Sequence, residues 1–273
     1  MKRSFHHLSC EGETLAATMD AGSKSTGLLI VSGGNEVRSG AHNGMAGLAA
    51  IFSDLGFPVL RFDRRGIGES SGDNSEFLTS APEIMAASAF LREQMPPQSK
   101  IFAFGNCDAA TALALFGEAA DIDGYILANP WVIDPSEQPS ENETTQTAAS
   151  IRSRYWNRLK DPKSILDLFS GKIDLGKLFK GLSQATKKED ISNLSIELRD
   201  AFSKIQKPVH ILLAKRDTTA TVFAGAWQDS AFSSVRSMPN IDLRSLDTAS
   251  HSFADAKSKS WLYDQIREML ESA

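Results

Sequence analysis

The sequence predicts a doubly wound α/β fold, with a mostly parallel sheet, helices on both of its faces and one helical insertion. Short apolar runs alternate along the chain with segments whose apolar residues recur at helical spacing. The runs show little polar alternation, as expected for strands buried on both faces of a parallel sheet. The alternation stops after Trp131 and resumes near residue 207, which marks the insertion. Right-handed strand–helix–strand crossovers then give the doubly wound architecture.

The expected elements begin with a hairpin over residues 4–19 that turns at Glu11-Gly12. Later apolar runs predict strands at residues 27–31, 57–63, 101–105, 125–128, 209–214 and 241–246. Helical spacing of apolar residues is clearest at residues 45–55 and in the C-terminal stretch 262–270.

Two domains follow from this pattern. We expect residues 1–131 and 207–273 to form the core domain, and residues 132–206 to form a helical cap. The cap would lie over the carboxyl ends of the strands, where open α/β sheets bind ligands. Its apolar residues at helical spacing are Phe169, Leu175, Leu178, Phe179 and Leu182.

Composition argues against several classes of protein. The chain has 273 residues and a formal net charge of −5, which gives no general attraction to nucleic acid. Its two cysteines cannot form the disulfide framework of a small secreted protein. No apolar stretch follows the basic N-terminus, so no secretory signal is visible. No segment approaches the apolar length that a membrane span needs. We therefore expect a cytoplasmic protein without an integral membrane segment. No cofactor and no metal are predicted, and the oligomeric state stays open.

The strand at residues 101–105 leads into a small turn that carries a cysteine. The turn reads Gly105-Asn106-Cys107-Asp108-Ala109 and precedes a run of helix formers. This is the layout of a nucleophile elbow, G-x-S-x-G, with Cys in place of Ser and Ala in place of the last Gly. A helix N-terminus stabilises a thiolate. We take Cys107 as the nucleophile and Cys10 as structural, with a buried, inert Cys107 as the alternative.

A nucleophile of this kind needs a general base and a group that orients the base. Only His210 and His251 follow Cys107, and His210 lies inside the strand at residues 209–214. His251 stands between the last strand and the final helix and is the predicted base. Asp217 directly follows a strand and is the predicted orienting carboxylate. Three aspartates are weaker candidates by position: Asp229, Asp242 and Asp247.

Acyl transfer also needs two hydrogen-bond donors for the oxyanion. One should be the backbone N–H of Asp108, the residue after the nucleophile. The second should come from the loop after residues 27–31, where two glycines let the backbone approach a substrate. Gly34 is the first candidate and Asn35 the second, while an ordinary glycine turn is the alternative.

Residues 63–70 resemble the D-x-R-G-x-G-x-S turn of α/β-hydrolases in the serine aminopeptidase and acylglycerol lipase-like branch. The chain is more similar still to the α/β-hydrolases encoded with the exosortase A system of exopolysaccharide-producing bacteria. The motifs that carry this resemblance are Gly33, Gly34, Arg38 and His42, then residues 57–63, 105–108 and 129–131.

The resemblance implies an α/β-hydrolase fold and a Cys-Asp-His triad of Cys107, Asp217 and His251, without an established substrate. Dienelactone hydrolases are similar in using a cysteine at the elbow. The candidates for substrate binding are Arg38, Asn106 and Trp131.

The cap segment gives one indication of the substrate. Residues 151–188 hold ten Lys or Arg and three acidic residues, a local charge of +7 in a chain of −5. A basic lid would attract an anionic substrate such as a phosphopantetheine thioester, an acidic glycan or a lipid headgroup. Solvated helix faces explain the charge equally well. The apolar residues of the cap would line the lid or make a weak peripheral membrane contact.

The sequence thus predicts an acyl hydrolase, an esterase or a thioesterase, that forms a covalent acyl-enzyme on a small-molecule substrate. Its resemblance links it to exopolysaccharide and exosortase systems. Two alternatives stay open: an acyltransferase that uses the same site, and a non-catalytic protein of the same fold that binds a partner.

Overall fold

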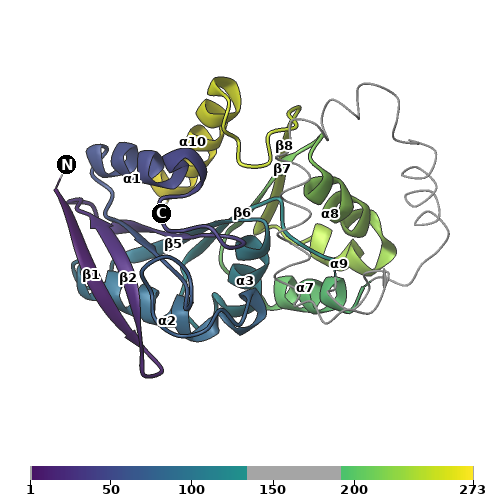
Figure 1. Cartoon of the computed structure of the whole chain (residues 1–273). Coiled ribbons are helices and arrows are strands. Elements are labelled where there is room, and N and C mark those ends of the chain that lie inside the picture. Colours follow the sequence, from purple (N-terminus) through teal and green to yellow (C-terminus); the bar gives the residue numbers. More distant parts are fainter. Residues whose placement is uncertain (1, 134–191, 273) are drawn as a thin grey trace, which may run out of the picture. The chain divides into compact units, whose positions relative to one another are not determined.

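The computed structural model describes residues 2–133 and 192–272. In this part of the chain an eight-stranded sheet carries helices on both faces (Figure 1). The strands are β1 (Arg3–Cys10), β2 (Glu13–Asp20), β3 (Thr26–Val31), β4 (Val59–Phe62), β5 (Lys100–Asn106), β6 (Gly124–Ala128), β7 (Val209–Ala214) and β8 (Ile241–Leu246). The α-helices are α1 (Gly44–Asp54), α2 (Ala81–Glu93), α3 (Asp108–Phe116), α7 (Asn193–Lys204), α8 (Thr218–Gln228), α9 (Ser233–Arg236) and α10 (Ala256–Glu271).

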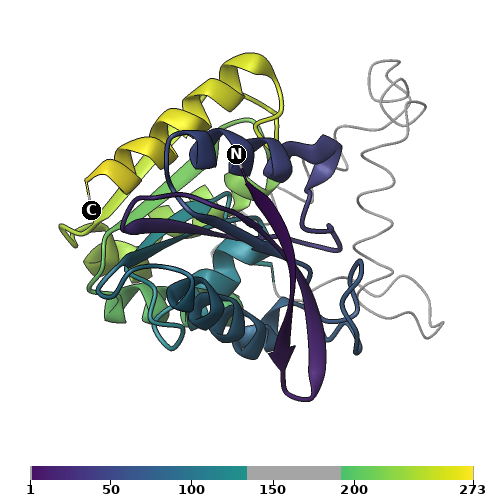
Figure 2. The same ribbon diagram turned by 90° about the vertical axis from the view of Figure 1, so that its left-hand side faces the viewer.

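The strand order is β1-β2-β4-β3-β5-β6-β7-β8. The β1–β2 hairpin is antiparallel and turns at Glu11-Gly12, as expected, and β2 also pairs antiparallel with β4. All other neighbouring strands run parallel. Figure 2 views the sheet from the side of this hairpin. The prediction of a mostly parallel, doubly wound sheet is confirmed.

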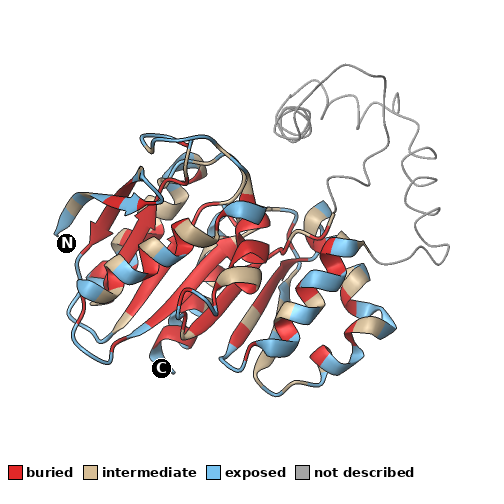
Figure 3. Ribbon diagram, turned by 90° about the horizontal axis from the view of Figure 1, so that it is seen from below, coloured by how far each residue is buried: buried red, intermediate tan, exposed pale blue. Residues whose placement is uncertain are grey.

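Each central strand supplies two apolar cores, because successive side chains point to opposite faces of a sheet. On β3, Leu29 and Val31 belong to the core that includes α2, α3, α7 and α8. Leu28 and Ile30 belong to the core that includes α1 and α10. In Figure 3 the strands are buried along most of their length, whereas the helices expose their outer faces.

Helix α7 belongs to the compact unit that contains the sheet, Met1–Val132 and Leu194–Ala273. Its buried residues share an apolar core with α3 and α8; they are Leu194, Leu198 and Phe202. The sequence assigned residues 132–206 to a cap, and the structure places the C-terminal end of this range with the sheet instead. The predicted cap ended where the next strand began. Helix α7 precedes that strand, but its apolar face packs in the core of the sheet unit.

Residues 134–191 of the predicted cap, with its basic residues and its apolar positions, lie outside the described residues. None of the helices that the structure describes is long and apolar enough to cross a membrane.

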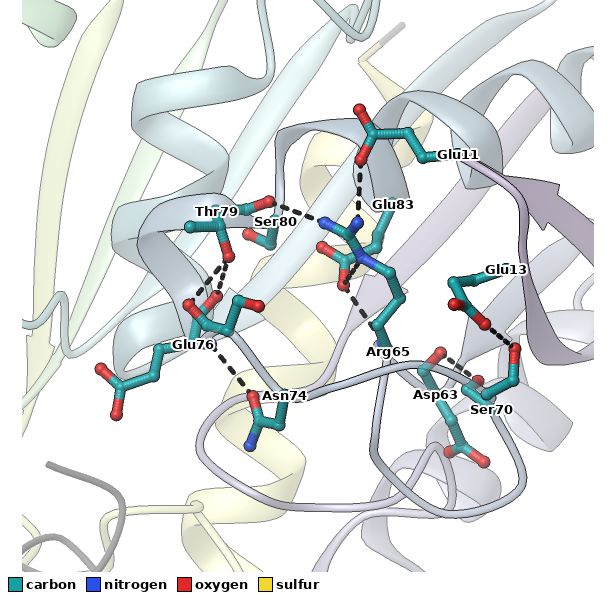
Figure 4. A network of polar contacts seen from close by, with 12 residues as sticks. Glu11, Glu13, Asp63, Arg65, Ser70, Asn74, Glu76, Thr79, Ser80 and Glu83 are labelled. Carbon is teal, nitrogen blue, oxygen red and sulfur yellow. Dashed lines mark hydrogen bonds and ion pairs between the residues drawn. The ribbon is translucent and has the colours of Figure 1, made fainter. Parts of the chain in front are cut away.

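Arg65, in the loop after β4, joins the hairpin to the start of α2 (Figure 4). Its Nε and its backbone N–H donate to Glu83 Oε1 at 3.2 and 3.1 Å. Its Nη1 lies 2.8 Å from Glu11 Oε2, and its Nη2 donates to the Thr79 carbonyl. The Glu83 side chain is 6% exposed and the Glu11 side chain is 59% exposed. One guanidinium group therefore bridges a buried and an exposed carboxylate.

Glu83→Ala should lower the free energy of unfolding by about 3 kcal/mol, because it leaves the largely buried Arg65 without its buried partner. Glu11→Ala removes the exposed partner of the same arginine and should lower it by less than about 1 kcal/mol. Urea unfolding of both variants measures the difference. Equal losses would contradict this division of roles.

Candidate active site

Cys107 forms a strained turn between β5 and α3. Its φ of 64° and ψ of −128° lie outside the regions that residues other than glycine ordinarily adopt. The Cys107 N–H donates to the Ala128 carbonyl of β6 at 2.9 Å, and its carbonyl accepts from the Ala110 N–H at 3.1 Å. This is the strand–turn–helix geometry of a nucleophile elbow.

Two glycines make room for the turn. A Cβ on Gly105 would lie 2.8 Å from the backbone of Ala109, at the start of α3. A Cβ on Gly33, in the loop after β3, would lie 2.5 Å from the Asn106 carbonyl oxygen and 2.7 Å from Asp108 Oδ1. Real Cβ contacts of this kind essentially never fall below 3.0 Å. The elbow and the loop after β3 are therefore in direct backbone contact.

The predicted acid and base are in contact. His251 Nδ1 lies 3.0 Å from Asp217 Oδ2, and the two side chains are 15% and 11% exposed. The same Oδ2 accepts from the Ala220 N–H at 3.0 Å, so Asp217 also caps the N-terminus of α8. An aspartate at Nδ1 holds the imidazole in the orientation that a general base requires.

Asp217 and His251 meet because β7 and β8 are neighbouring parallel strands whose carboxyl ends share one edge of the sheet. Hydrogen bonds continue past these ends. The Lys215 N–H donates to the Leu246 carbonyl and the Arg216 N–H to the Thr248 carbonyl, each at 2.9 Å. The loops that carry the acid and the base are therefore joined beyond the sheet.

The other candidates for these two roles have different surroundings. His210 lies within β7, opposite Asp242 of β8, and burial lowers the pKa of its imidazole, as does the nearby Arg244. Of the weaker aspartates, Asp242 contacts Arg244 and Asp247 contacts Arg216. Asp229 accepts from the Ala231 N–H. Position and contacts both favour Asp217 and His251.

Asp108 binds the loop after β3 to the elbow. The Gly34 N–H donates to Asp108 Oδ1 at 2.6 Å, and Asp108 Oδ2 lies 3.8 Å from Arg64 Nη2. Arg64 also donates to the Gly34 carbonyl. The single hydrogen of the Gly34 amide is thus directed at a protein carboxylate, which does not fit the predicted role of Gly34 as an oxyanion donor. The N–H groups of Asp108 and Asn35 stay as the predicted donors.

Arg38, a predicted substrate-binding residue, makes its contacts within the protein. Its guanidinium pairs with Asp63, with Glu69 at 2.5 Å and with the Thr18 hydroxyl at 2.9 Å. The Arg38 backbone N–H also donates to Asp63. These contacts occupy the guanidinium and connect the loops after β3 and β4, which does not fit the predicted role of Arg38 in substrate binding.

Three further predicted residues lie at the same edge of the sheet, Asn106 at the end of β5 and the other two in loops. Asn106 Oδ1 accepts from Asn129 Nδ2 at 3.0 Å. The half-buried Trp131 donates its backbone N–H to the Cys107 carbonyl at 3.3 Å. The side chain of Asn35 accepts from Asn74 at 2.9 Å. Contact with a substrate stays a prediction for Asn106 and Trp131, as does the oxyanion role of the Asn35 N–H.

Two residues that hold these loops, Arg64 and Asn129, had no predicted role of their own and stood only within the motifs at residues 63–70 and 129–131. Arg64 follows β4 and is 5% exposed; Asn129 follows β6 and is fully buried. Both come just after an apolar strand, where side chains of parallel strands converge. That position was the available signal.

No protein-family model and no curated protein matches the chain. Solved structures do match it. The esterase Pf2001 of Pyrococcus furiosus is similar over 99% of this chain and 91% of its own, with a TM-score of 0.67 and 19% identity. The α/β-hydrolase GrgF of Penicillium sp. sh18 is similar over 100% of this chain and 99% of its own, with a TM-score of 0.61 and 16% identity.

Est1E of Butyrivibrio proteoclasticus, solved with ferulic acid bound, is similar over 97% of this chain and 99% of its own. Its TM-score is 0.61 at 16% identity. These likenesses show that the chain has the α/β-hydrolase fold, as predicted, and at such low identity they concern the fold alone.

Gly33→Ala should lower the free energy of unfolding by about 2 kcal/mol, because its Cβ would meet a backbone oxygen that has no room to move. Gly225→Ala is the matched control. A Cβ there meets nothing within 4 Å, and alanine in α8 should raise the free energy of unfolding by about 0.5–1 kcal/mol. Thermal unfolding should show shifts of opposite sign, and a neutral Gly33→Ala would contradict the close contact.

Proposed function

We propose that this protein is an acyl hydrolase that forms a covalent acyl-enzyme on Cys107, with His251 as general base and Asp217 as the group that orients it. The strained backbone of Cys107 carries this proposal. Such a conformation costs roughly 1–3 kcal/mol and persists where the surrounding structure imposes it, most often at active sites. A cysteine that only filled space would gain nothing from it.

The surroundings of Cys107 support a thiolate. The residue is the N-cap of α3, so the sulfur is carried at the positive end of the helix dipole. The neighbouring Asp108 carboxylate is near Arg64 and accepts the Gly34 N–H. These two contacts offset the negative charge that the carboxylate places beside the sulfur.

The proposed reaction has two halves. The Cys107 thiolate attacks the ester or thioester carbonyl, and the Asp108 and Asn35 N–H groups stabilise the oxyanion. The intermediate collapses, and the leaving alkoxide or thiolate takes a proton from the His251 imidazolium. Water then gives its proton to His251 as it attacks the acyl-cysteine, and the acid departs as the thiolate is regenerated.

The chemistry of the substrate follows from weaker indications. The similar protein Pf2001 is an esterase, which supports an ester, while a thiol nucleophile suits a thioester equally. The excess of basic residues at 151–188 supports an anionic acyl substrate. A reducing cytoplasm would keep the catalytic thiol intact. The resemblance to exosortase-associated hydrolases supports a role in exopolysaccharide-producing bacteria.

Iodoacetamide should alkylate Cys107 at pH 7 at least about tenfold faster than a free peptide thiol, since a thiolate reacts and a thiol does not. His251→Ala should slow the reaction toward the rate of the free thiol. Peptide mapping separates Cys107 from the buried Cys10. A wild-type Cys107 that reacts no faster than a free thiol would count against catalysis and favour a non-catalytic binding protein.

Short p-nitrophenyl esters and acyl thioesters should be hydrolysed by the wild type. Cys107→Ala should lower kcat by about 10⁴-fold or more, and Asp217→Asn by roughly 10²–10⁴-fold. Asp247→Asn, which changes an exposed aspartate of the neighbouring loop, is the matched control and should leave kcat unchanged. An acyl-enzyme that is released only by an added alcohol would identify an acyltransferase.

A further inference from the structure

The side chain of Asn129 is fully buried and all of its polar atoms are engaged. Its Nδ2 donates to Asn106 Oδ1 at 3.0 Å and to the His251 carbonyl at 2.9 Å. Its Oδ1 accepts from the Ala214 N–H at 2.8 Å. The Ala214 N–H can only donate and the His251 carbonyl can only accept, so these two backbone groups determine which end of the amide is oxygen.

Each partner belongs to a segment that carries one proposed catalytic residue. Asn106 directly precedes Cys107, Ala214 ends the strand before Asp217, and His251 is the proposed base itself. The partners are 23, 85 and 122 residues from Asn129 in the sequence. One amide group therefore connects the three segments.

The backbone of Asn129 is itself held in place. Its N–H donates to the Leu212 carbonyl of β7 at 2.9 Å, and its φ of 43° is left-handed. Asparagine tolerates this conformation better than most residues. The backbone of Asn129 is thus bonded to β7 independently of its side chain.

We propose that Asn129 is a positioning residue that sets the placement of His251 relative to Cys107; this inference rests on the proposed function. Asp217 contacts the imidazole ring and fixes its orientation. That contact does not connect the loop after β8 to the elbow. Asn129 bonds the His251 backbone to the residue next to Cys107, so it holds the base at a set distance from the elbow.

Asn129→Asp tests this role because it keeps the shape of the side chain and the acceptor for the Ala214 N–H. It replaces the two donor N–H groups by an oxygen that faces Asn106 Oδ1 and the His251 carbonyl, both acceptors. A shift of about 1 Å in a catalytic group lowers the rate by about 10²-fold. We expect kcat on a p-nitrophenyl ester to fall 10- to 100-fold by this estimate, with little change in KM.

Asn240→Asp is the matched control. Asn240 Nδ2 donates to the Ile205 and Lys207 carbonyls, both at 2.9 Å, before the amino end of β8. The same substitution there also sets a carboxylate against two carbonyl groups, but away from the elbow. It should lower the melting temperature and leave kcat within about twofold, since it displaces no catalytic group.

The pH dependence gives a readout that a loss of stability alone would not produce. The introduced carboxyl group regains one donor when it is protonated, so kcat of Asn129→Asp relative to the wild type should rise as the pH falls. Asn129→Ala regains no donor and should show no such rise. The folded fraction of each variant is measured by circular dichroism at every assay pH.

Iodoacetamide alkylation of Cys107 in the same variants tests the proposed function separately from the role of Asn129. An inert wild-type enzyme with an ordinary thiol would overturn the proposed function and this inference with it. An active wild type together with an Asn129→Asp variant of unchanged kcat would overturn the inference alone. An equal loss of kcat in Asn240→Asp would also overturn it, because the effect would then lie in stability.

Discussion

The approach of β5 to the first turn of α3 is the contact on which the site depends. A Cβ on Gly105 would lie 2.8 Å from the backbone of Ala109, so only glycine allows the chain to turn within so few residues. The same compact turn holds Cys107 at a φ of 64° and at the N-terminus of a helix. The close contact at Gly105 therefore gives Cys107 both its strained backbone and its place at the helix N-terminus, where the dipole stabilises a thiolate. Gly33 extends the contact to the loop after β3.

The order of the parallel strands brings the residues of the site together. Strands β5, β6, β7 and β8 are successive neighbours, and their carboxyl ends lead into Cys107, Asn129, Asp217 and His251. The sheet brings these residues to one edge, as it does in other open α/β sheets. Hydrogen bonds beyond the strand ends then connect the loops: the Asp217–His251 contact joins the last two, and the Asn129 amide joins all of them to the elbow.

The arginines of the loops after β3 and β4 have a common role. Arg38 pairs with Asp63 and Glu69, Arg64 binds the Gly34 carbonyl beside Asp108, and Arg65 bridges Glu83 and Glu11. A planar guanidinium with several donors can bind backbone and carboxylate groups of different segments at once. The turn at residues 63–70, which carries the resemblance to known hydrolases, thus works as a scaffold in this chain. It shapes the loop beside the elbow and supplies none of the proposed reacting groups.

The sequence by itself determined the strands, the hairpin, the elbow and the chain order of Cys107, Asp217 and His251. Apolar runs and turn residues are local signals, and parallel strands bring their ends together in any fold of this class. Only the tertiary structure decided which polar groups meet. The Gly34 N–H turns to Asp108, 74 residues away, and the Asn129 amide reaches His251, 122 residues away. Packing also decided that α7 belongs to the core of the sheet unit and not to the predicted cap. Such contacts depend on atomic distances between segments that are remote in the chain, and no local pattern encodes those distances.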